Sequence, residues 1–198
     1  MSVAAEPRTA QSLRSGGRPA PDPAQRRRAL RHLASPVSVL TVSHSDRLHG
    51  TTVSTVTTVS LSPLILGACL KAGSVFAELA AAEGRFSVNV LGGTQGPVAR
   101  WFADSSRPDG AEQFAGLPWH ADPYGRAPLL EGALAHYTCR LVGSTVVGDH
   151  EVLLGRVVHA VTGDGDPLLS FAGGLFAGAL NPVAPRNDTP TKKENTAP

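Results

Sequence analysis

The segment HGTTVSTVTTVSLSP, residues 49–63, decides how this chain folds. Every residue from 51 to 60 is Ser, Thr or Val, and a run this rich in β-branched side chains is expected to be extended. A strand with one face in water alternates apolar and polar residues, whereas here both alternating faces carry hydroxyl groups. Two polar faces are awkward in a plain core and suit the wall of a ligand cleft. The segment therefore predicts a strand beside a binding site, with a dimer seam or an accident of β-propensity as the alternatives.

Strand patterns lie on both sides of this segment. The turn sequence HSDR, residues 44–47, joins it to a preceding apolar run and predicts a hairpin. Turns rich in glycine and aspartate separate the last three strand patterns. The other predicted strands cover residues 37–43, 64–70, 85–91, 133–147, 151–163 and 167–172. Because consecutive hairpins make antiparallel sheets, and about seven short strands favour closure of the sheet edges, we expect a mainly β fold with an antiparallel barrel.

Three helices are predicted at the periphery of this barrel, from apolar residues that recur with helical spacing. The first has Asp22 as its cap and Pro23 in its first turn, which are start signals for a helix. The predicted helices cover residues 22–33, 71–84 and 94–103, with the inward residues Ala29, Leu30 and Leu33, then Val75, Phe76, Leu79 and Ala80, then Val98, Trp101 and Phe102. Residues 104–132 show no clear pattern except a brief strand at 117–121.

The length of 198 residues favours a single domain. We expect that domain to span residues 22–181, because residues 1–21 and 182–198 have the composition of disordered tails. The net charge of +2 is small, and the arginines at 26–28 are typical of a solvated helix start, so a nucleic-acid partner is not expected.

Two cysteines, Cys69 and Cys139, lie far apart inside apolar runs. This spacing suits no metal, so no metal site is expected, and two buried reduced thiols indicate a cytoplasmic protein. The N-terminal residues have no apolar run of the secretory type, and no window is apolar enough for a membrane span. The sequence therefore predicts neither secretion nor a membrane partner.

The sequence contains no nucleophile motif and few acidic residues in its apolar segments, so general acid–base catalysis has little to build from. It does contain KAGS, residues 71–74, where a strand ends and a helix begins. The charge of Lys71, the hydroxyl of Ser74 and the free N–H groups of the first helical turn are suited to a phosphate. The alternative is that Ser74 only caps the helix while Lys71 lies in solvent.

Four segments in register resemble one known family. HGTTVSTVTTVSLSP, LILGACLKAGSVFAEL, GRFSVNVL and the turn GDH followed by EVLLGRV are similar to the flavin reductase-like family of FMN-binding split barrels, over about residues 28–169. The resemblance implies an antiparallel split β-barrel with Greek-key-like connections. It implies an oxidoreductase, an NAD(P)H-dependent FMN reductase that supplies reduced flavin to a partner monooxygenase, with FAD as an alternative flavin. It also implies a homodimer, which would cover the apolar residues 173–180 unless these return along the barrel.

The same resemblance assigns roles to individual residues. One group lines the isoalloxazine ring and the ribityl chain, a second grips the phosphate, a third lies close to the flavin pocket, and the turn GDH lies on the nicotinamide side. In that order the residues are Thr52, Val53, Ser54 and Thr55; Lys71 and Ser74; Phe86 and Asn89; and Gly148, Asp149 and His150. His150 is the expected catalytic residue, because an imidazole on a tight turn can stack on a flat ring or hydrogen-bond to it. A histidine that only caps its own turn is the alternative.

The C-terminal strand region departs from the family. Many relatives carry a pattern like L-x-Y-x-R-G-x-Y, whereas this chain has PLLSFAGGLFAGAL, with Ser170, Ala172 and Leu175 at the Tyr, Arg and second Tyr positions. Phe171 and Phe176 offer stacking surface, but nothing replaces the arginine. A second hypothesis therefore stays open, in which a bound flavin acts directly on an organic substrate. A third is a module without enzyme activity.

Overall fold

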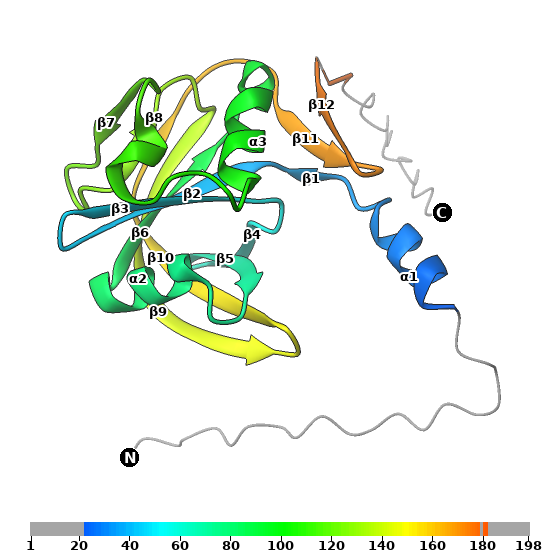
Figure 1. Ribbon diagram of the computed structural model, residues 1–198, viewed down its shortest axis with the longest axis horizontal. Helices are drawn as coiled ribbons and strands as arrows, with labels where there is room; N and C mark the ends of the chain where they lie inside the picture. Colours follow the sequence, from blue (N-terminus) through cyan, green and yellow to red (C-terminus); the bar gives the residue numbers. More distant parts are fainter. Residues whose placement is uncertain (1–21, 179, 182–198) are drawn as a thin grey trace, which may run out of the picture.

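The computed structural model describes residues 22–178 and 180–181, which form a curled antiparallel β-structure with peripheral helices (Figure 1). The predicted tails at 1–21 and 182–198 lie outside the described residues, so the domain bounds stay a prediction. The main sheet has seven strands in the order β3-β2-β6-β9-β10-β5-β4. Its strands are β2 (Ser38–His44), β3 (Arg47–Val53), β4 (Thr57–Leu61), β5 (Leu64–Lys71), β6 (Arg85–Val90), β9 (Ala135–Val147) and β10 (His150–Thr162).

Two smaller sheets complete the β-structure of the described residues. One has the order β1-β11-β12 and the other joins β7 to β8. Their bounds are β1 (Ser35–Pro36), β7 (Trp119–Ala121), β8 (Pro128–Leu130), β11 (Leu168–Phe171) and β12 (Gly174–Ala177). Every strand pair in all three sheets is antiparallel, as the runs of hairpins predicted. The brief strand expected at 117–121 is confirmed as β7, while β1, β8 and β12 were not predicted.

The hydroxyl-rich segment is not one strand. It leaves the sheet at the end of β3, crosses over residues 54–56, and enters the opposite edge of the same sheet as β4. Thr55 fixes this crossover, because its Oγ1 donates to the carbonyl of Cys69 at 2.9 Å and accepts from the N–H of Cys69 at 3.1 Å. The chain itself therefore brings the two edges of the sheet together, which is the fold of a split barrel.

Apolar side chains fill two layers, one inside the barrel and one between the sheet and its outer elements. The strand β2 serves both, because Leu40 faces the barrel interior while Val39 faces the outer layer. Inside the barrel, the rings of Phe76 and Phe86 meet edge to face with centroids 6.1 Å apart. In the outer layer, Phe102 packs against the residues that precede β7. Strands such as β6 are thus buried on both faces, which is why their polar residues need partners inside the protein.

Two of the predicted helices pack on the barrel. The helix α2 (Val75–Glu83) begins at its cap Ser74 and ends at Gly84, whose φ of 71° is the left-handed conformation that glycine favours. The helix α3 (Gly96–Ala103) follows the short 3₁₀ helix η1 (Gly93–Gln95). The predicted inward faces are partly wrong, because Val75 and Trp101 are 40% and 37% exposed. Among the described residues, no helix is long and apolar enough to cross a membrane.

The first helix, α1 (Pro23–Leu30), stands apart from the barrel beside the sheet β1-β11-β12 (Figure 1). Its predicted start is confirmed, because the side chain of Asp22 accepts from the N–H of Ala24 at 3.1 Å. Its predicted packing is wrong, because none of its residues is buried and both Leu30 and Leu33 are about two-thirds exposed.

Candidate functional site

A cleft of about 560 Å³ opens between β3, the start of α2 and the chain that follows α3. The strand β3 supplies Arg47, His49, Thr51 and Thr52. The end of β5 and the start of α2 supply Lys71, Ser74, Val75 and Phe76. The third side, from the end of α3 onward, consists of Phe102, Ala103, Ser105, Arg107, Pro108 and Asp109. Three separate parts of the chain thus meet at one site. Val75 lines this cleft, which explains why it is more exposed than its place in the helical pattern predicted.

The two faces of β3 do different work. Arg47, His49 and Thr51 alternate along the strand and line the cleft. On the other face, Thr52 donates from Oγ1 to the carbonyl of Ala99 in α3 at 2.9 Å. Gly50 lies on that face too, where a Cβ atom would stand 2.6 Å from a ring carbon of Phe102. One face therefore meets the ligand space, and the other holds the helix and reaches the cleft only through Thr52.

The start of α2 forms the opposite wall. Lys71 is the last residue of β5, and Ser74 caps the helix by accepting from the N–H of Ala77 at 3.3 Å. The capping role that was an alternative for Ser74 is therefore present, and the residue also lines the cleft beside Lys71. A helix N-terminus and an ammonium group on one wall favour an anionic ligand.

The segment after α3 adds charge from a region whose structure the sequence did not predict. Arg107 donates to the carbonyl of Gly50 and to that of Asp104, both at 2.6 Å, so it ties the segment to β3. Asp109 pairs with Arg47, with Nη2 and Oδ2 2.5 Å apart. The backbone N–H of Gly110 and then Arg47 hold the pKa of Asp109 below its usual value. Asp109 is therefore ionised at neutral pH and offsets one of the nearby positive charges.

His49 is held neutral by the same surroundings. Burial and then the charge of Arg107 lower its pKa from 6.5 to about 4. At neutral pH the charged residues that line the cleft are therefore Arg47, Lys71 and Arg107 against Asp109. The excess of positive charge attracts anions.

Three of the predicted site residues meet in the cleft, namely Thr52, Lys71 and Ser74. Val53 is 7% exposed and packs in the barrel core. Ser54 and Thr55 lie in the crossover that follows β3, and the hydroxyl of Thr55 is bonded to the backbone of β5. These last three residues do not line the cleft, so their flavin contacts stay a prediction.

Phe86 and Asn89 are both buried and lie away from the cleft walls. Asn89 in β6 donates from Nδ2 to the carbonyl of Val39 at 3.0 Å and to Oγ1 of Thr41 at 3.1 Å. Its Oδ1 accepts from the N–H of Leu130 at 2.8 Å. The structure thus uses this amide to join three strands inside the protein, and it does not bring Phe86 or Asn89 to the cleft.

The turn GDH adjoins the Lys71 end of the cleft. His150 is the register partner of Lys71 across β10 and β5, and the carbonyl of Asp149 accepts from the N–H of Ala72 at 3.1 Å. Gly148 has a φ of 64°, which the tight turn requires. Nδ1 of His150 lies 2.9 Å from Oδ1 of Asp149, and this hydrogen bond lowers the pKa of Asp149. The imidazole is half-exposed and held by its neighbour, so the turn contact that was an alternative for His150 is present.

The sequence did not single out four of the residues described above, namely Arg47, His49, Arg107 and Asp109. The alternation of Arg47, His49 and Thr51 was a usable signal, because side chains two apart on a strand share a face. Arg107 and Asp109 had no such signal, because they follow α3 in a stretch rich in Asp, Ser and Pro without periodicity.

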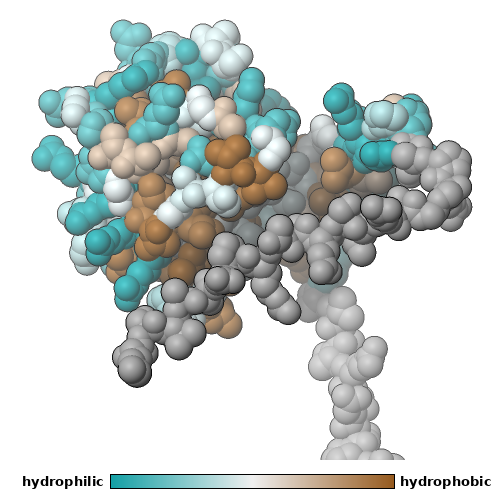
Figure 2. Space-filling model, turned by 90° about the horizontal axis from the view of Figure 1, so that it is seen from below, coloured by the Kyte–Doolittle hydropathy of each residue, from teal (hydrophilic) through white to brown (hydrophobic). Residues whose placement is uncertain are grey.

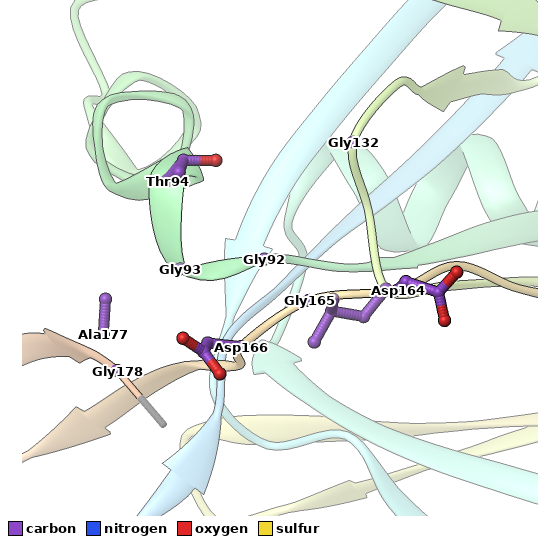
Figure 3. Close-up of a pocket in the computed structure, with 10 residues that line it drawn as sticks. Gly92, Gly93, Thr94, Gly132, Asp164, Gly165, Asp166, Ala177 and Gly178 are labelled. Atoms are coloured by element: carbon purple, nitrogen blue, oxygen red, sulfur yellow. The ribbon is translucent and has the colours of Figure 1, made fainter. Parts of the chain in front are cut away.

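A second cavity of about 410 Å³ lies where η1, the loop before β11 and the end of β12 meet (Figure 3). Glycines form much of its wall, and Thr94, Asp164 and Asp166 supply its polar side chains. Two carboxylates without a lining cation repel phosphate, so this cavity does not suit a phosphorylated cofactor. Within the described ranges, no group of three or more His, Cys, Asp or Glu side chains is placed to hold a metal ion.

Comparison with known proteins gives a consistent result. Residues 30–179 match the family model described as flavin reductase like domain. An NADPH-flavin oxidoreductase of Streptomyces viridifaciens is 38% identical over 146 residues, which cover 73% of this chain and 75% of that protein. An NADH-dependent FAD reductase of Streptomyces globisporus is 36% identical over 155 residues, covering 78% of this chain and 85% of that protein.

Solved structures agree with this match. BorF, the flavin reductase component of a bacterial two-component tryptophan halogenase, superposes with a TM-score of 0.74 at 30% identity, covering 79% of this chain and 98% of that one. The Streptomyces globisporus NADH:FAD oxidoreductase SgcE6, solved with NAD and FAD fragments, gives a TM-score of 0.72 at 32% identity, with 84% of this chain and 96% of that chain covered.

Proposed function

Because the chain belongs to the flavin reductase like family, we propose that it is an NAD(P)H-dependent flavin reductase that supplies reduced flavin to a partner monooxygenase. The observation that carries the proposal is the cationic cleft, with Lys71 beside the capped start of α2 and Arg107 on the facing segment. A reductase component of a nitrophenol monooxygenase from Rhodococcus opacus, 35% identical over 154 residues, supports the monooxygenase partner.

The donor set of the cleft fits a phosphorylated flavin such as FMN or FAD. A flavin phosphate is a multiply charged anion, and Lys71 with the first N–H groups of α2 offers it a cation and backbone donors. Arg107 adds a second cation at the facing wall. Bound there, the flavin supplies the hydride acceptor for NADH or NADPH.

The remaining task of the chain is to orient two flat rings. In this proposal, residues 52–55 of the β3 end and crossover lie along the isoalloxazine ring and ribityl chain, and the turn GDH holds the nicotinamide. The hydrogen bond that Nδ1 of His150 donates to Asp149 fixes the imidazole ring at that turn, which is the property that an orienting residue needs. Phe86 and Asn89 support the pocket from the core, where their own partners hold them.

We also propose a homodimer, because apolar side chains are exposed where α1 and the hairpin β11–β12 leave the barrel. The exposed apolar side chains in and beside these elements are Leu30, Leu33, Phe171, Phe176 and Leu180. Figure 2 shows that apolar side chains also gather on the face of the molecule seen from below. Exposed apolar surface of this kind is typical of an interface. The paired substitution Leu33→Ser and Phe176→Ser is expected to convert a dimer to a monomer in light scattering, and a monomeric wild type contradicts the proposal.

The free thiols of Cys69 and Cys139 support a cytoplasmic location, because reducing compartments keep cysteines unpaired. The reductase activity is tested by anaerobic titration of the FMN-loaded protein with NADH and with NADPH. We expect the flavin absorbance to bleach with at least one of them. Bleaching that needs a further organic substrate favours the alternative of a flavin acting directly on that substrate, for which the unusual residues Ser170, Ala172 and Leu175 are the supporting observation.

A further inference from the structure

Gln113 is a fully buried amide that connects the cleft segment to β3. Its Oε1 accepts from the N–H of Gly50 and from Nε of Arg107, both at 3.2 Å. Its Nε2 donates to Oδ1 of Asp109 at 3.4 Å. A backbone N–H and a guanidinium can only donate, and an ionised carboxylate can only accept. The partners therefore fix which end of the amide is oxygen and which is nitrogen.

This orientation decides the tautomer of His49. Nδ1 of His49 lies 3.2 Å from Nε2 of Gln113, which has only hydrogens to offer. Nδ1 must therefore accept, and the proton of the neutral ring sits on Nε2. Asp109 is the competing partner, but its Oδ1 is 3.8 Å from Nδ1 and its carboxylate already receives Arg47. Burial and the charges of Arg107 and Arg47 oppose a second proton on the ring.

The Nε2–H group of His49 remains without a protein partner among the described residues. Among those residues, Oγ of Ser38 is the only side-chain N or O atom that is both buried and without a hydrogen-bond partner. Because Nε2 of His49 also has no partner, it cannot be buried, and protein does not enclose it. His49 is 12% exposed and lines the cleft together with Lys71 and Ser74. The free nitrogen thus reaches the ligand space.

We propose that His49 is a further ligand-binding residue of the cleft, whose neutral ring donates from Nε2 to an oxygen of the ribityl phosphate arm of the flavin, with Gln113 as its positioning residue. The proposal rests on the proposed function. A neutral donor suits this place, because three cations already line the cleft and a hydrogen bond from an uncharged ring needs no further buried charge. The ribityl chain and the phosphate both present oxygen acceptors, and riboflavin separates them because it lacks the phosphate.

The binding test compares His49→Ala with wild type for FMN and for riboflavin, by quenching of flavin fluorescence. We expect FMN affinity to fall by about three- to tenfold, the effect of one hydrogen bond. An equal loss for riboflavin assigns the bond to the ribityl chain, and a loss for FMN alone assigns it to the phosphate. His120→Ala is the matched control, because His120 is exposed on β7 away from the cleft and is expected to leave both affinities unchanged.

The orientation test needs no flavin. In ¹⁵N-histidine spectra, the signal that disappears in His49→Ala is expected to report a neutral ring with its proton on Nε2 from about pH 5.5 to 8. In Gln113→Glu the new carboxylate accepts from Nδ1, so His49 is expected to titrate at higher pH. Since Arg47, Arg107 and Asp109 face His49 in both proteins, the difference between them isolates Gln113.

The outcomes separate the two proposals. A wild type that binds no FMN overturns the proposed function and the ligand assignment together. If His49→Ala binds FMN as tightly as wild type does, and riboflavin as tightly as wild type does, the inference alone is overturned. A proton found on Nδ1 of His49 overturns the role of Gln113. If Gln113→Glu does not fold, as its melting curve would show, the wild-type spectrum still decides the tautomer.

Discussion

Two cavities of similar size differ in charge, and the difference shows what makes a cofactor site. The cleft beside β3, about 560 Å³, is lined by Arg47, Lys71 and Arg107. The cavity beside β12, about 410 Å³, is lined by Asp164 and Asp166. Size alone does not separate the two cavities. The charged groups on their walls separate them, because the cleft beside β3 offers a phosphate cations and a helix N-terminus, whereas the cavity beside β12 offers it carboxylates.

The sharpest test of this contrast is Lys71→Glu. The substitution replaces a cation on the cleft wall by an anion, and Lys71 is exposed at the end of β5, so folding is expected to be unaffected. We expect FMN affinity to fall by roughly 100-fold, as for the loss of a charged partner of a phosphate. The paired control is Asp166→Asn in the second cavity, for which isothermal titration calorimetry should show unchanged FMN binding. Equal effects of both changes contradict the assignment of the cleft.

A second test uses the proton equilibrium of His49. Its pKa is about 4 in the folded protein, whereas the unfolded chain has the ordinary value of 6.5. Between pH 4 and pH 6.5 the unfolded chain therefore binds more protons than the folded protein. Folding stability is therefore expected to fall as the pH drops from 6.5 towards 4, by roughly 2 kcal/mol after allowance for solvent near the cleft. Urea unfolding of wild type and His49→Gln over this range measures it. A difference between the two proteins that does not change with pH rules out this role of His49.

The third test concerns the face of β3 that packs against α3. In Gly50→Ala the new Cβ would lie 2.6 Å from a ring carbon of Phe102, so the ring or the strand must shift. We expect a loss of about 1.5 kcal/mol in unfolding free energy, typical of overpacking. Gly143→Ala in β9 is the control, because no atom lies within 4 Å of its Cβ position. Chemical denaturation measures the unfolding free energy of both variants. Equal losses in Gly50→Ala and Gly143→Ala would show that the contact with Phe102 relaxes without cost.

The sequence predicted the barrel well because its strands and hairpin turns carry local signals. The turn before β3 is one example, since Ser45 and Asp46 adopt φ values of 48° and 62°, as a tight two-residue turn requires. The hydroxyl-rich segment was recognised as a site wall, but its break after Val53 was not. The crossover depends on the bond between Thr55 and Cys69, which are fourteen residues apart and meet only in the folded sheet.

The site was predicted only where the chemistry is local. Lys71 and Ser74 lie together at one strand–helix junction, so their spacing revealed them. Arg107 reaches β3 through the carbonyl of Gly50, a contact between residues 57 apart that no pattern in a loop announces. Asn89 is a different case: the partners that hold its amide lie on β2 and β8, and no pattern within β6 predicts them.

The smallest expected effect comes from the single carboxylate of the cleft. Asp109→Asn removes a negative charge next to Arg47 and keeps an oxygen that accepts from Gln113, so the segment is expected to hold its place. The cleft then carries more positive charge, and FMN is expected to bind about twofold more tightly at low salt, with the gain lost at high salt because exposed charges are screened. Asp164→Asn, which removes the same charge from the second cavity, should leave FMN binding unchanged at either salt concentration. Calorimetric titrations of both variants at two ionic strengths measure the difference. Weaker FMN binding in Asp109→Asn would mean that the ion pair between Asp109 and Arg47 orders the cleft, and that this effect outweighs the repulsion between Asp109 and the phosphate.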